Sequence, residues 1–390
     1  MTTDESAVGW DTLADRHWDR TPVVLPGRED EPPVDAGRAF DVAVAAAAPF
    51  RAGTRFRALP DVRFFTAAGR IRAPGDRLPG PDDPTVDHYL KRLDGEPSLL
   101  AVEQPLMLDA ALWSQVRDLI RPLWQRVGFP VLPVVAELTI GDGLDRDDGP
   151  ADASTHAVLT WVLRGRMEVR VESAPPAGPR ETLRVEPGDV LYRPGGRRVQ
   201  ESHQDGCLAL HLRIPMDPRL PSAAVTGLVA DLLQARRADG GRVPYLPFPP
   251  PRDPDGVVTP IAPLVAAGEA LSGAAGDPEL NRILRVQWAR RVSACGLEPV
   301  PDPGAPAALT PDHLVRLTGE VIRMPDGPGA ALWAVNGHVF AVRGTSADGL
   351  LDRLRTPVTV GELTAGGDGL LPLLHRLSAL RGIEVLEGSC

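Results

Sequence analysis

Residues 149–170 have the sequence GPADASTHAVLTWVLRGRMEVR, and residues 185–198 have the sequence VEPGDVLYRPGGRR. The first segment contains an apolar run from Val158 to Leu163 that ends at Arg164-Gly165-Arg166. In the second, Val190 to Tyr192 follow a Pro-Gly-Asp turn and are closed by Pro194. Short apolar runs bounded by Gly and Pro are typical of buried strands. The two segments therefore predict two strands of one β domain.

These two segments resemble the metal-bearing strands of JmjC-type cupins. In that family the first strand carries G-x-H-x-D before an apolar run that ends in G-R-K/R. The second strand carries P-G-D-V-L-Y-x-P, and a second His follows five residues later. Pro187 to Pro194 match the second motif without a gap. The resemblance implies an α+β protein built on a JmjC-type double-stranded β-helix barrel.

The residues that bind iron in the family are replaced here. The motif alignment puts Asp152 and Ser154 at the first His and the acid, and Val199 at the second His. Two imidazoles and a carboxylate hold Fe(II), and Val199 offers only hydrocarbon. Met167 stands where the family tends to carry a basic residue that binds 2-oxoglutarate through a charge-assisted pair. We therefore expect neither iron nor 2-oxoglutarate as a cofactor.

Composition limits the partners of this 390-residue chain. Lys and Arg number 42 against 52 Asp and Glu, a net charge of −10, which argues against a nucleic-acid or anionic-membrane surface. No stretch is apolar enough to span a membrane, and the N-terminus lacks the pattern of a secretory signal. Three scattered cysteines do not make a disulfide framework. We expect a cytoplasmic protein, and the abundance of Gly, Pro and Arg with one Lys suggests a GC-rich bacterial genome.

The chain divides into three predicted parts. Residues 1–215 form the cupin domain, with its barrel core at about 133–215, and 216–303 form a helical segment. Residues 304–390 form a winged-helix-like domain, as in the ribosomal-oxygenase branch of the family. The resemblance implies that the helical segment makes a homodimer.

Within the C-terminal domain, Thr310-Pro311-Asp312 predicts a helix start, and Asn336-Gly337 predicts the turn of a hairpin. Residues 304–390 hold 7 basic and 9 acidic residues, too few cations for a DNA-binding surface.

Alternation along the strands predicts which side chains face the barrel interior. Asp152, Ser154 and His156 share one face of the first strand, and Cys207 and His211 share a face of the partner strand. The intervening residues 201–206 are polar and predict a loop, in which His203 is solvated.

Three interpretations of this interior cluster stay open. It is a hydrogen-bonded polar core or peptide-binding pocket, or an acid/base site in which His156 or His211 moves a proton and Asp152 orients it. The third interpretation is a relocated metal site of Asp152, His156 and His211. Cys207 is a candidate nucleophile or a small buried hydrophobe.

The candidate substrate-binding residues are Ser154 of the interior face and three arginines at the barrel mouth, which could bind an acidic peptide or a carboxylate. These arginines are Arg193, Arg197 and Arg198.

The leading hypothesis is a peptide-tailoring protein, from modified-peptide or natural-product biosynthesis, whose barrel binds a peptide and has lost iron/2-oxoglutarate chemistry. If it is an enzyme, proton transfer such as epimerisation or isomerisation is the expected class. One alternative is a non-catalytic pseudo-oxygenase that binds a peptide or a partner enzyme. A second is an iron/2-oxoglutarate peptide hydroxylase with a rearranged site.

Overall fold

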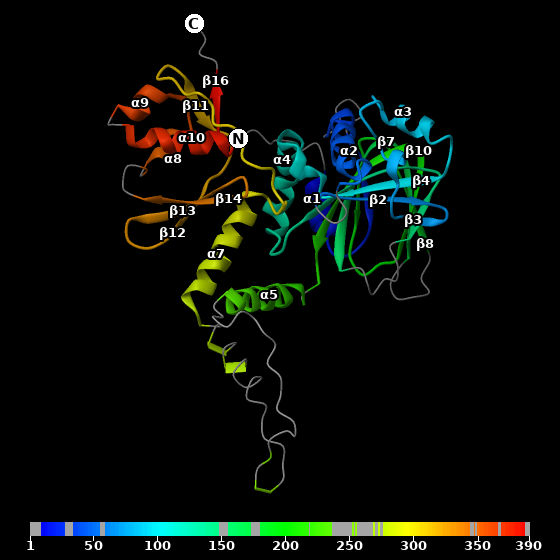
Figure 1. Ribbon diagram of the computed structural model, residues 1–390, viewed down its shortest axis with the longest axis horizontal. Coiled ribbons are helices and arrows are strands. Elements are labelled where there is room, and N and C mark those ends of the chain that lie inside the picture. Colours follow the sequence, from blue (N-terminus) through cyan, green and yellow to red (C-terminus); the bar gives the residue numbers. More distant parts are fainter. Residues whose placement is uncertain are drawn as a thin grey trace. The chain divides into compact units, whose positions relative to one another are not determined.

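The computed structural model divides into two units, Met1–Asp217 with Ala289–Cys390, and Pro218–Trp288 (Figure 1). It describes residues 9–27, 34–54, 59–147, 155–172, 180–217, 219–235, 252, 254–255, 268–269, 272–273, 276–343, 347, 349–365 and 368–386.

Two long strands, β7 (His156–Glu172) and β10 (Val199–Pro215), organise the barrel. They are antiparallel partners along almost their whole length, and each bends in the middle. The bend of β7 is at Gly165, and the bend of β10 is at Asp205-Gly206, where all three residues have positive φ. A Cβ atom on Gly165 would lie 2.7 Å from the backbone of Cys207, so the two bends are in close contact.

Because of these bends, each long strand belongs to two sheets. Before its bend β7 pairs with β9 (Val190–Arg193), and after it with β8 (Arg180–Val185). Before its bend β10 pairs with β6 (Asp145–Asp147), and after it with β5 (Val135–Asp142). Two sheets that share their long strands form the predicted double-stranded β-helix.

The larger sheet continues on both sides of the barrel in the order β1-β9-β7-β10-β5-β4-β2-β3. The added strands are β1 (Val23–Leu25), β4 (Ser98–Glu103), β2 (Asp61–Thr66) and β3 (Gly69–Ile71).

Three helices contribute buried residues to the same core as the barrel sheet. They are α2 (Ala36–Arg51), α3 (Val86–Arg92) and α4 (Ala110–Val127). Each is capped by the residue before it, and Asp109 illustrates the reason: its carboxylate accepts the otherwise unpaired backbone N–H groups of Ala111 and Leu112. Short helical turns complete this part of the chain, at Trp10–Thr12, Leu13–His17, Gly75–Arg77 and Pro105–Leu108.

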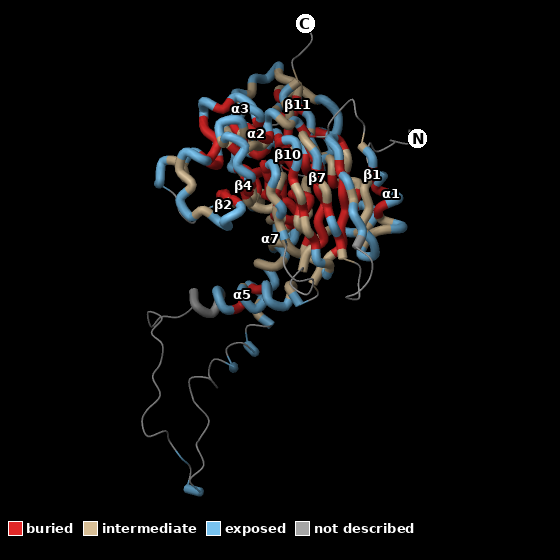
Figure 2. Tube along the Cα trace, turned by 90° about the vertical axis from the view of Figure 1, so that its right-hand side faces the viewer, coloured by how far each residue is buried: buried red, intermediate tan, exposed pale blue. Residues whose placement is uncertain are grey.

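Alternation along β7 and β10 creates two separate apolar layers. Leu159, Trp161 and Leu210 belong to a core that also contains residues of α2 and α4. Val162 and Cys207 belong to a second cluster inside the barrel. Buried residues follow the whole length of both strands in Figure 2. The barrel interior is therefore separate from the helix-covered core.

The C-terminal part is a mixed domain with its own core and two small sheets, ordered β15-β11-β16 and β12-β13-β14. This mixture agrees with the predicted winged-helix domain. Asn336 and Gly337 form the predicted turn, with positive φ at both residues. The predicted helix start at Thr310-Pro311-Asp312 is wrong, because a turn there leads into strand β11.

The elements of this domain are β11 (Leu314–Leu317), β12 (Ile322–Pro325), β13 (Ala330–Val335), β14 (His338–Arg343), α8 (Leu350–Arg353), β15 (Val358–Thr359), α9 (Val360–Thr364), a 3-10 turn (Asp368–Leu370), α10 (Leu371–Ala379) and β16 (Ile383–Leu386).

The predicted helical segment contains α5 (Leu220–Ala235) and α7 (Pro278–Ser293). Val229 of α5 and Leu280 of α7 form a small apolar cluster. Among the described residues, no helix is both long and apolar enough to cross a membrane.

Candidate functional site

A group of polar side chains lies inside the barrel around His211, which is 2% exposed. The strand register brings Thr160 of β7 opposite His211, and Thr139 of β5 opposite the neighbouring Ala209. His211 Nδ1 is 2.9 Å from Thr160 Oγ1, and His211 Nε2 is 2.9 Å from Thr139 Oγ1. Burial lowers the pKa of His211 to about 4. The ring is therefore a neutral imidazole whose two nitrogens both have hydroxyl partners.

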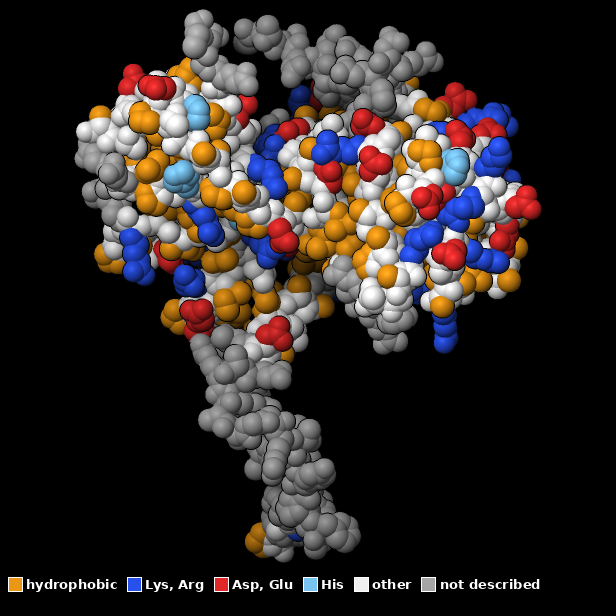
Figure 3. All heavy atoms as spheres, turned by 45° about the horizontal axis from the view of Figure 1, so that its top comes forward, with side chains coloured by type: hydrophobic (Ala, Val, Ile, Leu, Met, Phe, Trp, Pro, Cys, Tyr) orange, Lys and Arg blue, Asp and Glu red, His pale blue; other side chains and the backbone are white. Residues whose placement is uncertain are grey.

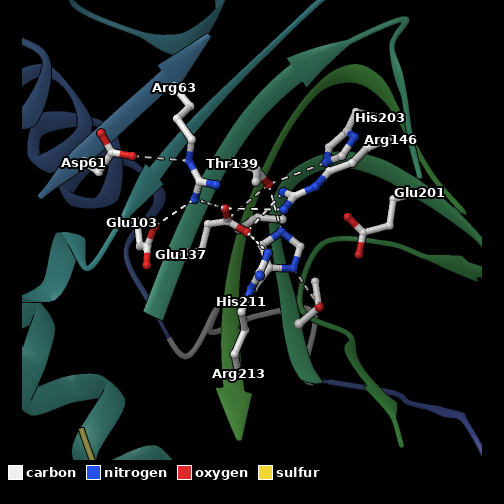
Figure 4. Close-up of polar contacts among 12 residues, drawn as sticks. Asp61, Arg63, Glu103, Glu137, Thr139, Arg146, Glu201, His203, His211 and Arg213 are labelled. Carbon is white, nitrogen blue, oxygen red and sulfur yellow. Dashed lines mark hydrogen bonds and ion pairs between the residues drawn. The ribbon is translucent and has the colours of Figure 1, made fainter. Parts of the chain in front are cut away.

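The bend of β10 brings the side chains of Glu201 and His203 close to His211 (Figure 4). One ligand atom from each of Glu201, His203 and His211 lies within 4.8 Å of the others. His203 Nε2 is 3.5 Å from Thr139 Oγ1, and His203 Nδ1 is buried without a hydrogen-bond partner among the described residues. Burial also lowers the pKa of His203. Two imidazoles and a carboxylate thus converge in the barrel interior.

Glu201 forms a buried ion pair with Arg193, in which Arg193 Nη2 donates to Glu201 Oε1 at 2.9 Å. Burial alone would raise the pKa of the Glu201 carboxyl, but Arg193 and the neighbouring cations hold it below its ordinary value. Glu201 is therefore a carboxylate at neutral pH.

A second carboxylate, Glu137 of β5, binds three arginines. The distances are 3.1 Å from Arg63 Nη2, 3.0 Å from Arg146 Nη1 and 2.6 Å from Arg213 Nη2. Although burial opposes ionisation, these cations lower the pKa of Glu137 to about 2. Glu137 stands opposite His211 in the strand register, so this ion-pair network adjoins the histidine cluster (Figure 4).

Arg146 and Arg213 also line a surface cleft of about 490 Å³. Its apolar lining includes Phe65, Leu99 and Leu144. Two arginines that line the cleft therefore also bind the buried carboxylate of Glu137. On the face drawn in Figure 3, basic and acidic side chains lie beside one another.

Apolar side chains occupy two of the positions that the motif alignment assigns to iron and oxoacid binding. Val199 and Met167 are each 1% exposed and belong to the apolar cluster inside the barrel. Asp152 and Ser154, the other two positions, lie outside the described residues.

The expectation that His156 and His211 converge in one interior cluster is wrong. His156 stands opposite Pro215, whereas His211 stands opposite Thr160, four residues further along β7. At about 3.3 Å per residue, this separates the two histidines by roughly 13 Å along the strand. His156 is half-buried and its Nδ1 is 2.8 Å from Thr155 Oγ1. A relocated metal site that uses both His156 and His211 is therefore excluded by the register.

Cys207 lies on the predicted interior face but in apolar surroundings. It is fully buried in the cluster that contains Val162 and Ala209. Burial raises the pKa of its thiol well above the ordinary value. Since the thiolate is the reactive form, the geometry agrees with the small-hydrophobe interpretation of Cys207.

The three predicted mouth arginines have different environments. Arg193 is buried against Glu201 rather than exposed at the mouth, because the strand turns its side chain into the barrel. Arg197 donates to the carbonyl of Arg20 at 3.2 Å, and Arg198 forms an exposed ion pair with Asp147 at 2.8 Å. Arg193 was expected at the barrel mouth, and the structure corrects this expectation.

Sequence reasoning missed Glu201, His203 and Glu137. His203 was expected in a solvated loop, but residues 199–204 continue β10, and its side chain is completely buried. The alternation that places Val199 inward also places Glu201 and His203 inward. That signal was present in the sequence, but the polar composition of 201–206 concealed it.

Comparison with known proteins was informative only at the level of structure. Neither a scan against protein-family models nor a search of curated proteins found a match. The chain is similar to the structure of YcfD, a ribosomal oxygenase from Escherichia coli, in complex with cobalt and succinic acid, with 17% identity and a TM-score of 0.53. That match covers 97% of this chain and 98% of the other.

Two further YcfD structures from Escherichia coli agree. An X-ray structure matches with 16% identity and a TM-score of 0.54, and a complex with cobalt and 2-oxoglutarate matches with 17% identity and a TM-score of 0.51. Both matches cover 97% of this chain and 98% of the other. This chain therefore has the fold of a ribosomal-oxygenase-like JmjC cupin.

Proposed function

We propose that this protein binds a peptide or protein segment at its cupin barrel and does not perform iron/2-oxoglutarate oxygenation at the position that its fold family uses. The observation that carries the proposal is the burial of Val199 and Met167 in one apolar cluster inside the barrel. A ribosomal oxygenase with the same fold has a structure in complex with cobalt and 2-oxoglutarate. The present chain has the apolar side chains of Val199 and Met167 at two positions that the motif alignment assigns to such chemistry.

The physical argument concerns the groups that the reaction needs. Iron(II) in such sites is held by two imidazoles and a carboxylate, and the oxoacid needs a cation for its distal carboxylate. Val199 has no lone pair for a metal, and Met167 has no charge for an oxoacid. Both side chains pack in a cluster from which water is excluded, so an ion there would lose its hydration without compensation.

The surface cleft is the best-supported place for a peptide. Phe65 and Leu144 supply apolar contacts, and Arg146 and Arg213 supply cations beside Asp145 and Asp147, which line the same cleft. A guanidinium has five N–H donors, and Arg213 binds Glu137 through Nη2, so Arg213 can also donate to a carboxylate of the segment. We therefore infer that the preferred segment carries a carboxylate next to an apolar side chain.

Proton-transfer catalysis by His211 has less support than binding. Both of its ring nitrogens have hydroxyl partners, its side chain is buried, and burial lowers its pKa to about 4. A general base at neutral pH needs contact with the substrate and a pKa near the working pH. Epimerisation in a modified-peptide pathway therefore remains the second hypothesis, and a non-catalytic binding protein is the first.

Peptide binding to the purified chain tests the proposal. A library of labelled peptides should contain binders enriched in acidic residues. Arg213→Gln should weaken their binding by at least about tenfold, because one charge-assisted contact is lost. Arg184→Gln, at an arginine of β8 whose side chain is 85% exposed and lies outside the cleft, is the matched control and should change binding by less than about twofold.

Two outcomes would reject the binding proposal: no binder from a diverse library, or equal loss of binding in Arg213→Gln and Arg184→Gln. Solvent deuterium exchange then separates the two hypotheses. An epimerase exchanges the α-hydrogen of a bound peptide, and a binding protein leaves it in place.

A further inference from the structure

We propose that Glu201, His203 and His211 form a binding site for a zinc-class divalent metal ion, at a position different from the iron position of the fold family. The three residues are 1%, 0% and 2% exposed, and their ligand atoms lie within 4.8 Å of one another. The site is independent of the proposed peptide binding, because neither its residues nor its evidence involve the surface cleft.

The residue types suit the proposed ion. Imidazole nitrogens and a carboxylate oxygen bind Zn²⁺ and similar first-row ions at about 2.0–2.2 Å. Ligand atoms around such an ion are about 3.5 Å apart, so the three groups need to approach one another by roughly 1 Å. Glu201 and His203 lie before the bend of β10, and His211 lies after it. Rotation of these side chains would therefore have to supply the movement.

His203 supplies a second observation. Its Nδ1 atom is buried without a hydrogen-bond partner in the described part of the chain. A buried polar atom without a partner costs about 1–3 kcal/mol, and natural proteins rarely leave such an atom unsatisfied. A bound ion would either use this nitrogen directly or turn the ring so that Thr139 satisfies it.

The surroundings of His211 suit a metal ligand. Metal-bound histidines usually use their second ring nitrogen in a hydrogen bond that fixes the orientation of the ring. Thr160 and Thr139 contact opposite nitrogens of His211. An ion at one nitrogen would replace one threonine, and the other threonine would hold the ring.

Arg193 opposes the ion, since it binds Glu201 at 2.9 Å. Only Oε1 of Glu201 accepts this bond, and a carboxylate has a second oxygen for a metal. The ion must nevertheless bind beside a fixed positive charge. Removing that charge should therefore increase metal affinity, whereas an ordinary polar core would gain no affinity for metal from the same change.

The experiment uses the full chain, stripped with a chelator and titrated with Zn²⁺ or Co²⁺ alone. We expect one ion per chain, a visible Co²⁺ absorption band, and a higher midpoint of thermal unfolding when the ion is bound. His203→Gln removes one ligand without leaving a buried charge and should lower the affinity at least about 100-fold. His156→Gln, at a half-buried histidine on the partner strand, is the control and should leave the affinity within about threefold.

Glu201→Gln alone leaves Arg193 buried without its carboxylate partner, so the double variant Glu201→Gln/Arg193→Gln is the better test of the carboxylate ligand. It should fold and bind metal at least about tenfold more weakly than Arg193→Gln. Absence of a stoichiometric ion in the folded wild-type chain, or equal affinity in His203→Gln and wild type, would overturn the metal site. Succinate formation that His203→Gln leaves unchanged would instead overturn the proposed function and leave the metal site intact.

Discussion

At the residue scale, the barrel interior is distinguished by carboxylates and imidazoles whose charge states are fixed by their neighbours. Glu137 and Glu201 stay ionised because arginines surround them, and His211 stays neutral because it is buried between two threonines. These groups are costly to bury unless they are paired, so they make the interior sensitive to single substitutions.

His211 should therefore stay neutral in mildly acidic solution. An unfolded chain has the ordinary histidine pKa of about 6.5, and the pKa of His211 in the folded protein is lowered to about 4. Below pH 6.5 the unfolded state binds a proton that the folded state does not, so the stability contributed by neutral His211 is lost as pH falls from about 6.5 to about 4. Side-chain NMR, with His211→Gln to assign the signal, checks this, and a titration of His211 near pH 6.5 would be inconsistent with the described site.

Replacing Glu137 tests the three-arginine network. Glu137→Gln leaves three partly buried arginines without their buried carboxylate and should lower the free energy of unfolding by about 2 kcal/mol. Glu103→Gln is the matched control, because Glu103 also pairs with Arg63, at 3.0 Å, but is partly exposed. This change should lower the free energy of unfolding by less than about 1 kcal/mol. Denaturant unfolding measures both, and equal costs would contradict a buried network centred on Glu137.

At the element scale, the bends of β7 and β10 create the site. They carry each strand from one sheet to the other and bring Glu201 and His203 to His211. Gly165 permits the bend because its φ is +69° and the backbone of Cys207 lies where a side chain would be.

Gly165→Ala should therefore destabilise the fold by about 3 kcal/mol, from left-handed strain and from the contact with Cys207. Gly196→Ala controls for the strain alone, because Gly196 has a φ of +71° but no atom near its Cβ position. It should cost about 1 kcal/mol. Thermal or denaturant unfolding of the two variants compares them, and similar losses would show that the bends are not in tight contact.

The sequence predicted the two motif strands, the interior face that Cys207 and His211 share, and the Asn336-Gly337 turn, because each depends on local alternation or turn chemistry. It did not predict that His203 is buried, because Ser202, Gln204 and Asp205 give its segment the composition of a loop. Nor did it predict the separation of His156 from His211, since strand register depends on partners distant in the chain.

At the scale of the whole molecule, the described chain combines a cupin barrel, a helical segment and a winged-helix-like domain. The dimer that the family resemblance implies stays a proposal, supported by exposed apolar side chains on its two helices, Val225 of α5 and Trp288 of α7. Light scattering at micromolar concentration should give twice the mass of one chain. A monomer would remove the basis for an interface in this segment.

The central claim is that a barrel with the fold of a ribosomal oxygenase lacks oxygenase chemistry at the family position. Succinate release from 2-oxoglutarate tests it most directly, with Fe(II), ascorbate and a bound peptide supplied to the full chain. Because Val199 and Met167 fill two of the aligned positions with apolar side chains, we expect no succinate above a reaction without protein. Succinate formed together with an oxidised peptide, at many turnovers per chain in both the wild type and His203→Gln, would contradict the account.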